Sequence, residues 1–161
     1  EHVYVIEINP AKLALAASMG AIAIDARSAD PVDQIKEATA GKGVDVALEL
    51  IGSAKTMREA VLCLGPLGRA ALVGLTAESI SIHPYAQLIN KEVEIIGVSD
   101  HLATEIPALI ECTRSGKLRF SPETLRVVDL NAAQINAALD ALHDSIDHVR
   151  TVIVPSSTSD L

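Results

Sequence analysis

Residues 3–25, which read VYVIEINPAKLALAASMGAIAID, decide the fold of this chain. Residues 3–8 form a short apolar run rich in β-branched side chains, which predicts a buried strand. Asn9 followed by Pro10 predicts a helix start, because asparagine caps the first turn and proline lacks an N–H that is unpaired there anyway. The helix leads into a second predicted strand at residues 21–25.

The same alternation continues along the chain. Further helices are expected at 30–41 and after Ser53, and further strands at 44–50, 69–73 and 93–98, with a turn at 65–68. Strands that alternate with helices of about ten residues predict a parallel sheet covered on both faces. Beyond this region we expect a helix at 101–115, a strand at 125–130, a helix from Asn131 to His143 and a strand at 151–154. The change of pattern predicts a boundary near residue 100, with one domain over 1–100 and a second segment over 101–161.

Length and composition describe a folded globular chain. Of its 161 residues, 49% are hydrophobic and 21% are charged, which suits one domain, or one and a part, with a real core. Aromatic residues make up only 2%, and the net charge is −8, so the chain suits neither nucleic acid nor an anionic membrane. No apolar run reaches the roughly 18 residues of a membrane-spanning helix. We therefore expect no nucleic-acid partner and no membrane partner.

The cysteines and histidines carry no recognisable metal or redox pattern. Cys63 and Cys112 are isolated, which favours packed thiols in a reducing cytoplasm over a disulfide framework. The five histidines are scattered without ligand spacing, so we expect neither a metal site nor a catalytic residue in this chain. The chain opens on Glu1 without an initiator methionine or a basic region, so we expect a cut N-terminus and no signal peptide.

Glu7 is the first candidate binding residue. It lies at the carboxyl end of the first predicted strand, and ligands of doubly wound sheets bind at that edge. A carboxylate there can accept hydrogen bonds from both hydroxyls of an adenosine ribose, and it repels a 2′-phosphate. A carboxylate satisfied by backbone N–H groups at a helix start explains the same residue. Position in the sequence leaves both interpretations open.

Glycines follow three successive strands. Gly52, Gly74 and Gly97 each come at a predicted strand end, where a missing side chain lets the backbone approach a ligand or make a tight turn. The nearest match to a phosphate-binding Gly-x-Gly lies at residues 41–43. It precedes a strand instead of opening a helix, so we interpret it as a turn.

Five segments resemble one known family, in order and at the right spacing. They are VIEINPAKLALA (5–16), GKGVDVALELIG (41–52), LGPLGRAALVG (64–74), KEVEIIG (91–97) and HVRTVIVP (148–155). Together they are similar to the cofactor domain and the returning C-terminal segment of zinc-containing medium-chain alcohol dehydrogenases. The resemblance implies an α/β fold: a Rossmann-like, doubly wound parallel sheet.

The resemblance also implies roles for individual residues. Glu7 and Lys12 fall on the positions that bind the adenosine ribose of NAD, and Arg150 falls on the arginine that approaches the pyrophosphate. The segments that line the nicotinamide half of the site contain Ile51, Gly52, Val73, Gly74, Leu75, Val98 and Ser99. The cofactor implied is NAD. Zinc is implied for full-length members, but its ligands have no counterpart in this chain.

Several parts of the family's pattern have no counterpart in these residues. They are the N-terminal catalytic domain with its zinc ligands, the first Rossmann strand, and the glycine loop after that strand. Residues 101–161 are expected to hold a linking helix and the C-terminal segment of the catalytic domain. The chain therefore resembles the C-terminal part of such an enzyme.

These observations favour a cofactor-binding fragment of an NAD-dependent alcohol or polyol dehydrogenase, which by itself is not expected to be active. The substrate would be a small-molecule alcohol, bound through the domain that has no counterpart here. One alternative is a fragment of a zinc-independent NADPH quinone or enoyl reductase, which Glu7 opposes. Another is a non-catalytic nucleotide-binding or interaction module.

The first strand of a Rossmann sheet lies between the strands predicted here at 3–8 and 44–50. Without it, two apolar strand edges would lack partners, and such edges attract other strands. We therefore expect the chain to be completed by its N-terminal part or to form homo-oligomers. The outer strand at 93–98 is a second candidate for pairing between copies.

Overall fold

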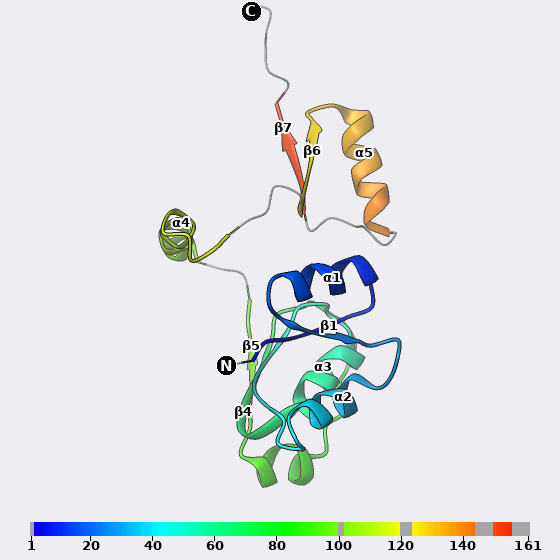
Figure 1. The fold of residues 1–161 in the computed structure, drawn as a ribbon, viewed down its shortest axis with the longest axis vertical. Helices are drawn as coiled ribbons and strands as arrows, with labels where there is room; N and C mark the ends of the chain where they lie inside the picture. Colours follow the sequence, from blue (N-terminus) through cyan, green and yellow to red (C-terminus); the bar gives the residue numbers. More distant parts are fainter. Residues whose placement is uncertain (1, 100–101, 120–123, 144–149, 156–161) are drawn as a thin grey trace, which may run out of the picture. The chain divides into compact units, whose positions relative to one another are not determined.

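The computed structural model describes residues 2–99, 102–119, 124–143 and 150–155 (Figure 1). They divide into two compact units, Glu1–His101 and Leu102–Leu161. The assignment of the second unit to a catalytic domain stays a prediction. Among the described residues, no helix is both long enough and apolar enough to cross a membrane.

The first unit alternates strands and helices, which confirms the α/β class. Its elements are β1 (Tyr4–Glu7), α1 (Pro10–Ser18), β2 (Ile22–Asp25), α2 (Pro31–Ala38), β3 (Val44–Glu49), α3 (Ala54–Leu62), β4 (Leu64–Leu72), the π-helix η1 (Pro84–Leu88), the 3-10 helix η2 (Ile89–Lys91) and β5 (Glu94–Gly97). The two short η segments were not anticipated from the sequence. Every strand pairing in this unit is parallel.

Side-chain caps start the three α-helices where the sequence predicts. The Asn9 side chain accepts a hydrogen bond from the Ala11 N–H at 2.9 Å, and Pro10 occupies the first turn of α1. The Asp30 side chain caps α2, and the Ser53 side chain caps α3. Each cap satisfies N–H groups that have no partner within the helix, so these local residues alone set the helix starts.

The parallel strands of the first unit form two separate sheets. β1 pairs with β2, whereas β3, β4 and β5 form a three-stranded sheet in that order. No hydrogen-bonded pairing joins the two sheets within the described residues. This division matches the position at which the first Rossmann strand would lie, between β1 and β3. Apolar side chains are exposed on the strands that flank it, with Ile6 at 42% and Leu48 at 67%.

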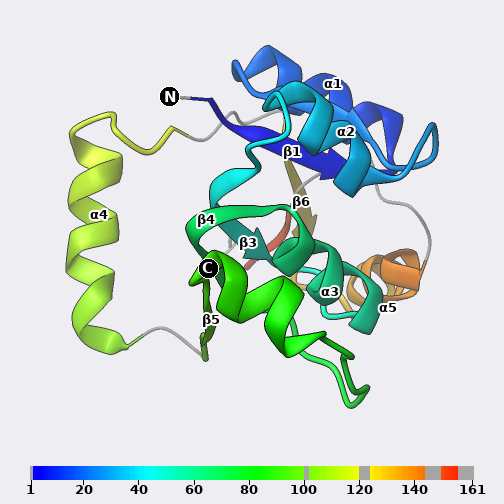
Figure 2. The ribbon, with the colours of Figure 1, turned by 90° about the horizontal axis from the view of Figure 1, so that it is seen from below.

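Helices cover the sheets, and their contacts form the core. α1 packs on β1 and β2, and α3 packs on β3 and β4 (Figure 2). One buried cluster joins Ile24, Val32, Ile35 and Cys63, with Tyr4 and Val44 packed against it. This cluster contains residues of both sheets and therefore holds them in one unit. A second cluster, formed by Val61, Leu64 and Ala70, lies between α3 and β4.

The turn predicted at residues 65–68 lies inside the bounds of β4, where none of these four residues pairs with β3. The pairing with β3 jumps there, from Val44 opposite Leu64 to Val46 opposite Arg69. The extra residues of β4 are accommodated as an irregular bulge, and Leu67 takes a positive φ of 60°. Glycine and proline predicted a turn here, and the structure places that turn within the strand, as a bulge between the paired residues Leu64 and Arg69.

The described residues of the second unit include two parallel strands and two longer helices. Its elements are η3 (Ala103–Glu105), α4 (Ile106–Arg114), β6 (Leu125–Asp129), α5 (Ala132–Asp140), η5 (Ala141–His143) and β7 (Arg150–Val154). β6 and β7 pair in parallel over their full lengths. The Asn131 side chain caps α5 through the N–H groups of Ala133 and Gln134, as the sequence predicts.

Candidate functional site

An acidic residue ends each of the first three strands: Glu7 ends β1, Asp25 ends β2 and Glu49 ends β3. Each carboxylate accepts hydrogen bonds from backbone N–H groups of the loop that follows its own strand. The carboxyl end of a parallel sheet is where ligands of this fold class bind. The question for the site is therefore which of these carboxylates is available to a ligand.

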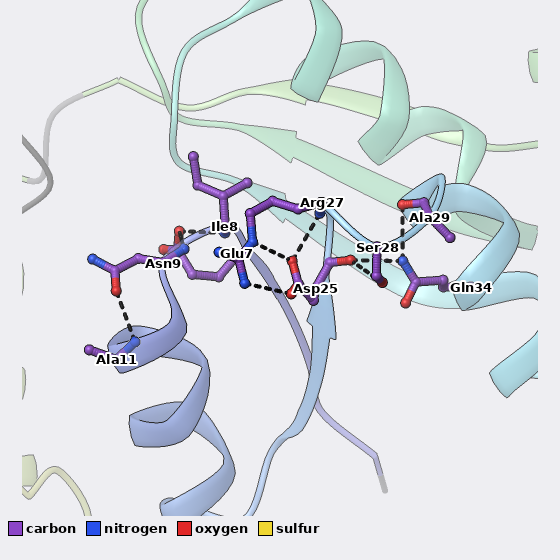
Figure 3. A network of polar contacts seen from close by, with 9 residues as sticks. All are labelled: Glu7, Ile8, Asn9, Ala11, Asp25, Arg27, Ser28, Ala29 and Gln34. Atoms are coloured by element: carbon purple, nitrogen blue, oxygen red, sulfur yellow. Dashed lines mark hydrogen bonds and ion pairs between the residues drawn. The ribbon is translucent and has the colours of Figure 1, made fainter.

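Glu7 remains half-buried at the end of β1. Its Oε1 accepts the Ile8 N–H at 2.7 Å and the Asn9 N–H at 3.0 Å (Figure 3). The backbone role considered for this residue is thus present, and both bonds go to the same oxygen. A half-buried carboxylate with its bonds on one oxygen keeps capacity to accept from a ligand. Lys12, also half-buried, lies in the first turn of α1.

Asp25 lies beside Glu7, because the two residues are register partners in the parallel pair β1–β2. Its carboxylate is engaged by Arg27, whose Nε and Nη2 donate at 2.9 Å and 2.7 Å (Figure 3). These side-chain hydrogen bonds from Arg27 lower the pKa of Asp25 to about 2. The Arg27 guanidinium is therefore held by the Asp25 carboxylate. The sequence analysis missed this pair, although an acid at a strand end was its signal.

The loops after β3 and β4 pack backbone against backbone. Gly52 has a φ of +86°, and a Cβ at this position would meet the Leu75 backbone nitrogen at 2.7 Å. A Cβ on Gly74 would meet Gly52 Cα at 2.6 Å. Both positions therefore require glycine because the two loops are in contact. At Gly97, by contrast, a Cβ would meet nothing within 4 Å.

Glu49 lies under this contact and is only 4% exposed. Its Oε1 accepts the N–H groups of Ile51 and Gly52, both at 2.9 Å, and the Thr56 hydroxyl at 2.8 Å. Burial works to raise the pKa of Glu49, yet hydrogen bonds from the Gly52 N–H and the Thr56 hydroxyl, with smaller contributions from two further N–H groups, outweigh it. The pKa therefore lies below its ordinary value. The sequence analysis missed Glu49, although it ends an apolar run just as Glu7 does.

The remaining nicotinamide-side candidates lie at the ends of β3, β4 and β5. The Val73 and Gly74 N–H groups both donate to the Glu49 carbonyl oxygen, at 2.9 Å and 3.1 Å. The Val98 N–H donates to the Leu72 carbonyl oxygen at 3.0 Å, which extends the β4–β5 pairing. Candidates with exposed side chains are Ile51, Leu75, Val98 and Ser99. The structure thus gathers the strand-end candidates of one sheet along a single edge.

Arg150 begins β7 in the second unit and is exposed. Its predicted approach to a pyrophosphate stays a prediction. Among the described residues, no group of three or more histidine, cysteine, aspartate or glutamate side chains could hold a metal ion. The described residues therefore do not fit the family's zinc.

The first unit offers a set of groups suited to a dinucleotide. A half-buried carboxylate ends β1, and the loops after β3 and β4 each contain a glycine beside an exposed apolar side chain, Ile51 and Leu75. A carboxylate binds ribose hydroxyls, and close backbone approach with apolar side chains suits a flat ring. None of the described groups is arranged to polarise an alcohol oxygen.

Known proteins are similar to this chain in sequence and in fold. The model of a family described as zinc-binding dehydrogenase matches residues 2–114. S-(hydroxymethyl)glutathione dehydrogenase of Synechocystis sp. is 30% identical, with 92% of this chain aligned to 41% of the relative. An NAD-dependent alcohol dehydrogenase of Sulfurisphaera tokodaii is also 30% identical, with 82% of this chain aligned to 37% of the relative.

Solved structures give the same result. Benzyl alcohol dehydrogenase from Acinetobacter calcoaceticus superposes with a TM-score of 0.84 at 28% identity, with 95% of this chain aligned to 42% of that one. The 2R,3R-butanediol dehydrogenase from Bacillus subtilis superposes with a TM-score of 0.83 at 26% identity, with 96% of this chain aligned to 44% of that one. The chain thus spans about two fifths of the length of the relatives it matches. It belongs to the zinc-binding dehydrogenase family and corresponds to the C-terminal portion of a zinc-containing medium-chain alcohol dehydrogenase.

Proposed function

We propose that this chain is the NAD-binding part of a zinc-type alcohol or polyol dehydrogenase, which transfers hydride between the carbinol carbon of an alcohol and the nicotinamide ring. The observation that carries the proposal is the half-buried carboxylate of Glu7 at the carboxyl end of β1. The similarity to an NAD-dependent alcohol dehydrogenase and to a butanediol dehydrogenase supports the reaction class. This chain covers 37% and 44% of the lengths of those two proteins.

Glu7 selects NAD by charge and by hydrogen bonding. An ionised carboxylate accepts bonds from both ribose hydroxyls of NAD, whereas the 2′-phosphate of NADP would bring like charges together. Hydrogen bonds to a charged group contribute about 1.5–3 kcal/mol, which corresponds to about tenfold or more in affinity. The Arg27 guanidinium, a group suited to binding a phosphate, is engaged by Asp25, the register partner of Glu7. The pairing of Arg27 with Asp25 therefore also favours NAD over NADP.

The other residues divide by the part of the cofactor that they would contact. Lys12 would reach the same ribose as Glu7, and Arg150 would bridge pyrophosphate oxygens with paired hydrogen bonds. The nicotinamide half would be lined by Ile51, Gly52, Val73, Gly74, Leu75, Val98 and Ser99. The alcohol would bind largely through residues outside this chain.

The open strand edges support completion of the sheet by another segment. Val46 and Leu48 on β3 are 56% and 67% exposed beside the division between the two sheets. Such edges pair readily with a further strand, supplied either by the family's N-terminal part or by a second copy.

Both cysteines are free thiols, which agrees with the cytoplasm expected from the sequence.

Calorimetric titration of the full-length protein with NAD and with NADP tests the proposal. We expect preference for NAD, and Glu7→Ser should shift that preference toward NADP by about tenfold or more. Glu37→Ser, which removes an exposed acid from α2, is the matched control and should leave the preference unchanged. Equal binding of both cofactors by the unmodified protein would refute the role of Glu7. Preference for NADP would favour the reductase alternative instead.

A further inference from the structure

Glu49 is a buried carboxylate at the end of β3, and the proposed function gives it no role. It is almost fully buried, although burying a carboxylate is costly without compensation. Three donors converge on its Oε1, from Ile51, Gly52 and Thr56. Its Oε2 is buried too and has no hydrogen-bond partner among the described residues. Accepting the N–H groups of the following turn therefore accounts for only one of its two carboxylate oxygens.

The unpartnered oxygen faces the contact between the two loops. A Cβ on Gly74 would lie 2.8 Å from Glu49 Oε2, so the carboxylate fills the space beneath that glycine. The Gly74 N–H already donates to the Glu49 carbonyl oxygen at 3.1 Å, so it acts on the nearby carboxylate as an oriented dipole. The main chain and the side chain of Glu49 thus contact both loops at once.

We propose that Glu49 is a positioning residue that locks the loops after β3 and β4 together and so preforms the surface for the nicotinamide half of the cofactor. This inference rests on the proposed function, because those loops would carry Ile51, Gly52, Val73, Gly74 and Leu75. Glu49 itself has too little exposed surface to touch a ligand. It acts through backbone atoms that it holds, which lowers the ordering cost of binding.

The geometry requires a carboxylate and not merely a polar side chain of the same size. Glutamine at this position keeps one acceptor for the three donors that converge on Oε1. Its amide NH₂ would then take the place of Oε2, buried and without an acceptor. Rotating the amide would instead point NH₂ at the Ile51 and Gly52 N–H groups. Both orientations weaken the contact between the loops after β3 and β4, although the shape of the side chain is unchanged.

The test compares Glu49→Gln with Asp45→Asn, which neutralises an exposed acid on the same strand. Calorimetry on the full-length protein measures binding of NAD and of ADP-ribose, which lacks the nicotinamide. We expect Glu49→Gln to weaken NAD about tenfold and ADP-ribose by less than about threefold, with no change for Asp45→Asn. A residue that only stabilised the fold would affect both ligands alike.

Amide hydrogen exchange gives a readout that needs no ligand. Exchange at Ile51 and Gly52 should accelerate in Glu49→Gln, whereas Val98, whose N–H donates within the β4–β5 pairing, should stay protected. Thr56→Val removes one donor and keeps the carboxylate. It should shift exchange and NAD affinity in the same direction by a smaller amount, and it serves if Glu49→Gln fails to fold.

The outcomes separate this inference from the proposed function. If the unmodified protein binds NAD and Glu49→Gln binds it equally well, the positioning role is overturned while the NAD assignment stands. Equal losses for NAD and ADP-ribose also overturn it. If the unmodified protein binds no NAD, the proposed function is refuted. Amide exchange alone then tests whether Glu49 holds the loops after β3 and β4 together, and unchanged exchange rates at Ile51 and Gly52 in Glu49→Gln would refute that role.

Discussion

Replacing Gly74 by alanine should destabilise the first unit, although the backbone at this position does not have the positive φ that favours glycine. The added Cβ would lie 2.6 Å from Gly52 Cα and 2.8 Å from Glu49 Oε2, and it would also crowd the Gly52 nitrogen. These neighbours are a backbone and a buried carboxylate, so they cannot move aside independently. Overpacking of this kind costs about 1–3 kcal/mol.

Gly97→Ala is the matched control, because Gly97, which ends β5, likewise has no positive φ. A Cβ there would meet nothing within 4 Å. Alanine at a compatible position reduces the freedom of the unfolded chain and stabilises by about 0.4–1 kcal/mol. The two glycine-to-alanine substitutions should therefore have opposite signs.

Urea unfolding followed by circular dichroism measures the difference. With a denaturant slope of about 2 kcal/mol per molar, a loss of about 2 kcal/mol moves the midpoint down by about 1 M. The slope itself should stay unchanged, because the same surface becomes exposed on unfolding. Equal midpoints for Gly74→Ala and Gly97→Ala, or a higher midpoint for Gly74→Ala, would refute the contact between the loops.

Three further results are expected. Because the pKa of Asp25 is lowered from 3.8 to about 2, the stabilisation from its pair with Arg27 is fully present above pH 3.8 and is lost as the pH falls through about 2. Carboxyl-carbon NMR should show this titration, and Arg27→Gln should move it back toward 3.8. Burial raises the pKa of the Cys63 thiol to about 11, so Ellman's reagent should label Cys112 first in the native protein and both thiols alike in urea. Asp30→Ala removes the cap of α2 and should cost about 1 kcal/mol in chemical denaturation; an unchanged midpoint would contradict the cap.

Three strand-end acids show where sequence reasoning stops. Glu7, Asp25 and Glu49 all end apolar runs, and all three accept N–H groups from the following loop. Their local sequences do not distinguish them. Tertiary packing does: Glu49 is buried beneath a second loop, Asp25 is paired with Arg27, and Glu7 stays half-buried. The sequence selected Glu7 only by its place in a family pattern.

The sequence and the tertiary structure therefore determined different features of this protein. The sequence alone determined the order of the strands and helices and the helix starts at Asn9, Asp30 and Ser53, because caps and apolar periodicity act over a few neighbouring residues. Only the tertiary structure decided that β4 begins at Leu64, before the bulge at residues 65–68, and that Gly74 is needed for packing while Gly97 has open space around it. Both outcomes depend on atoms far away in the chain that folding brings within van der Waals distance, and no local pattern encodes them.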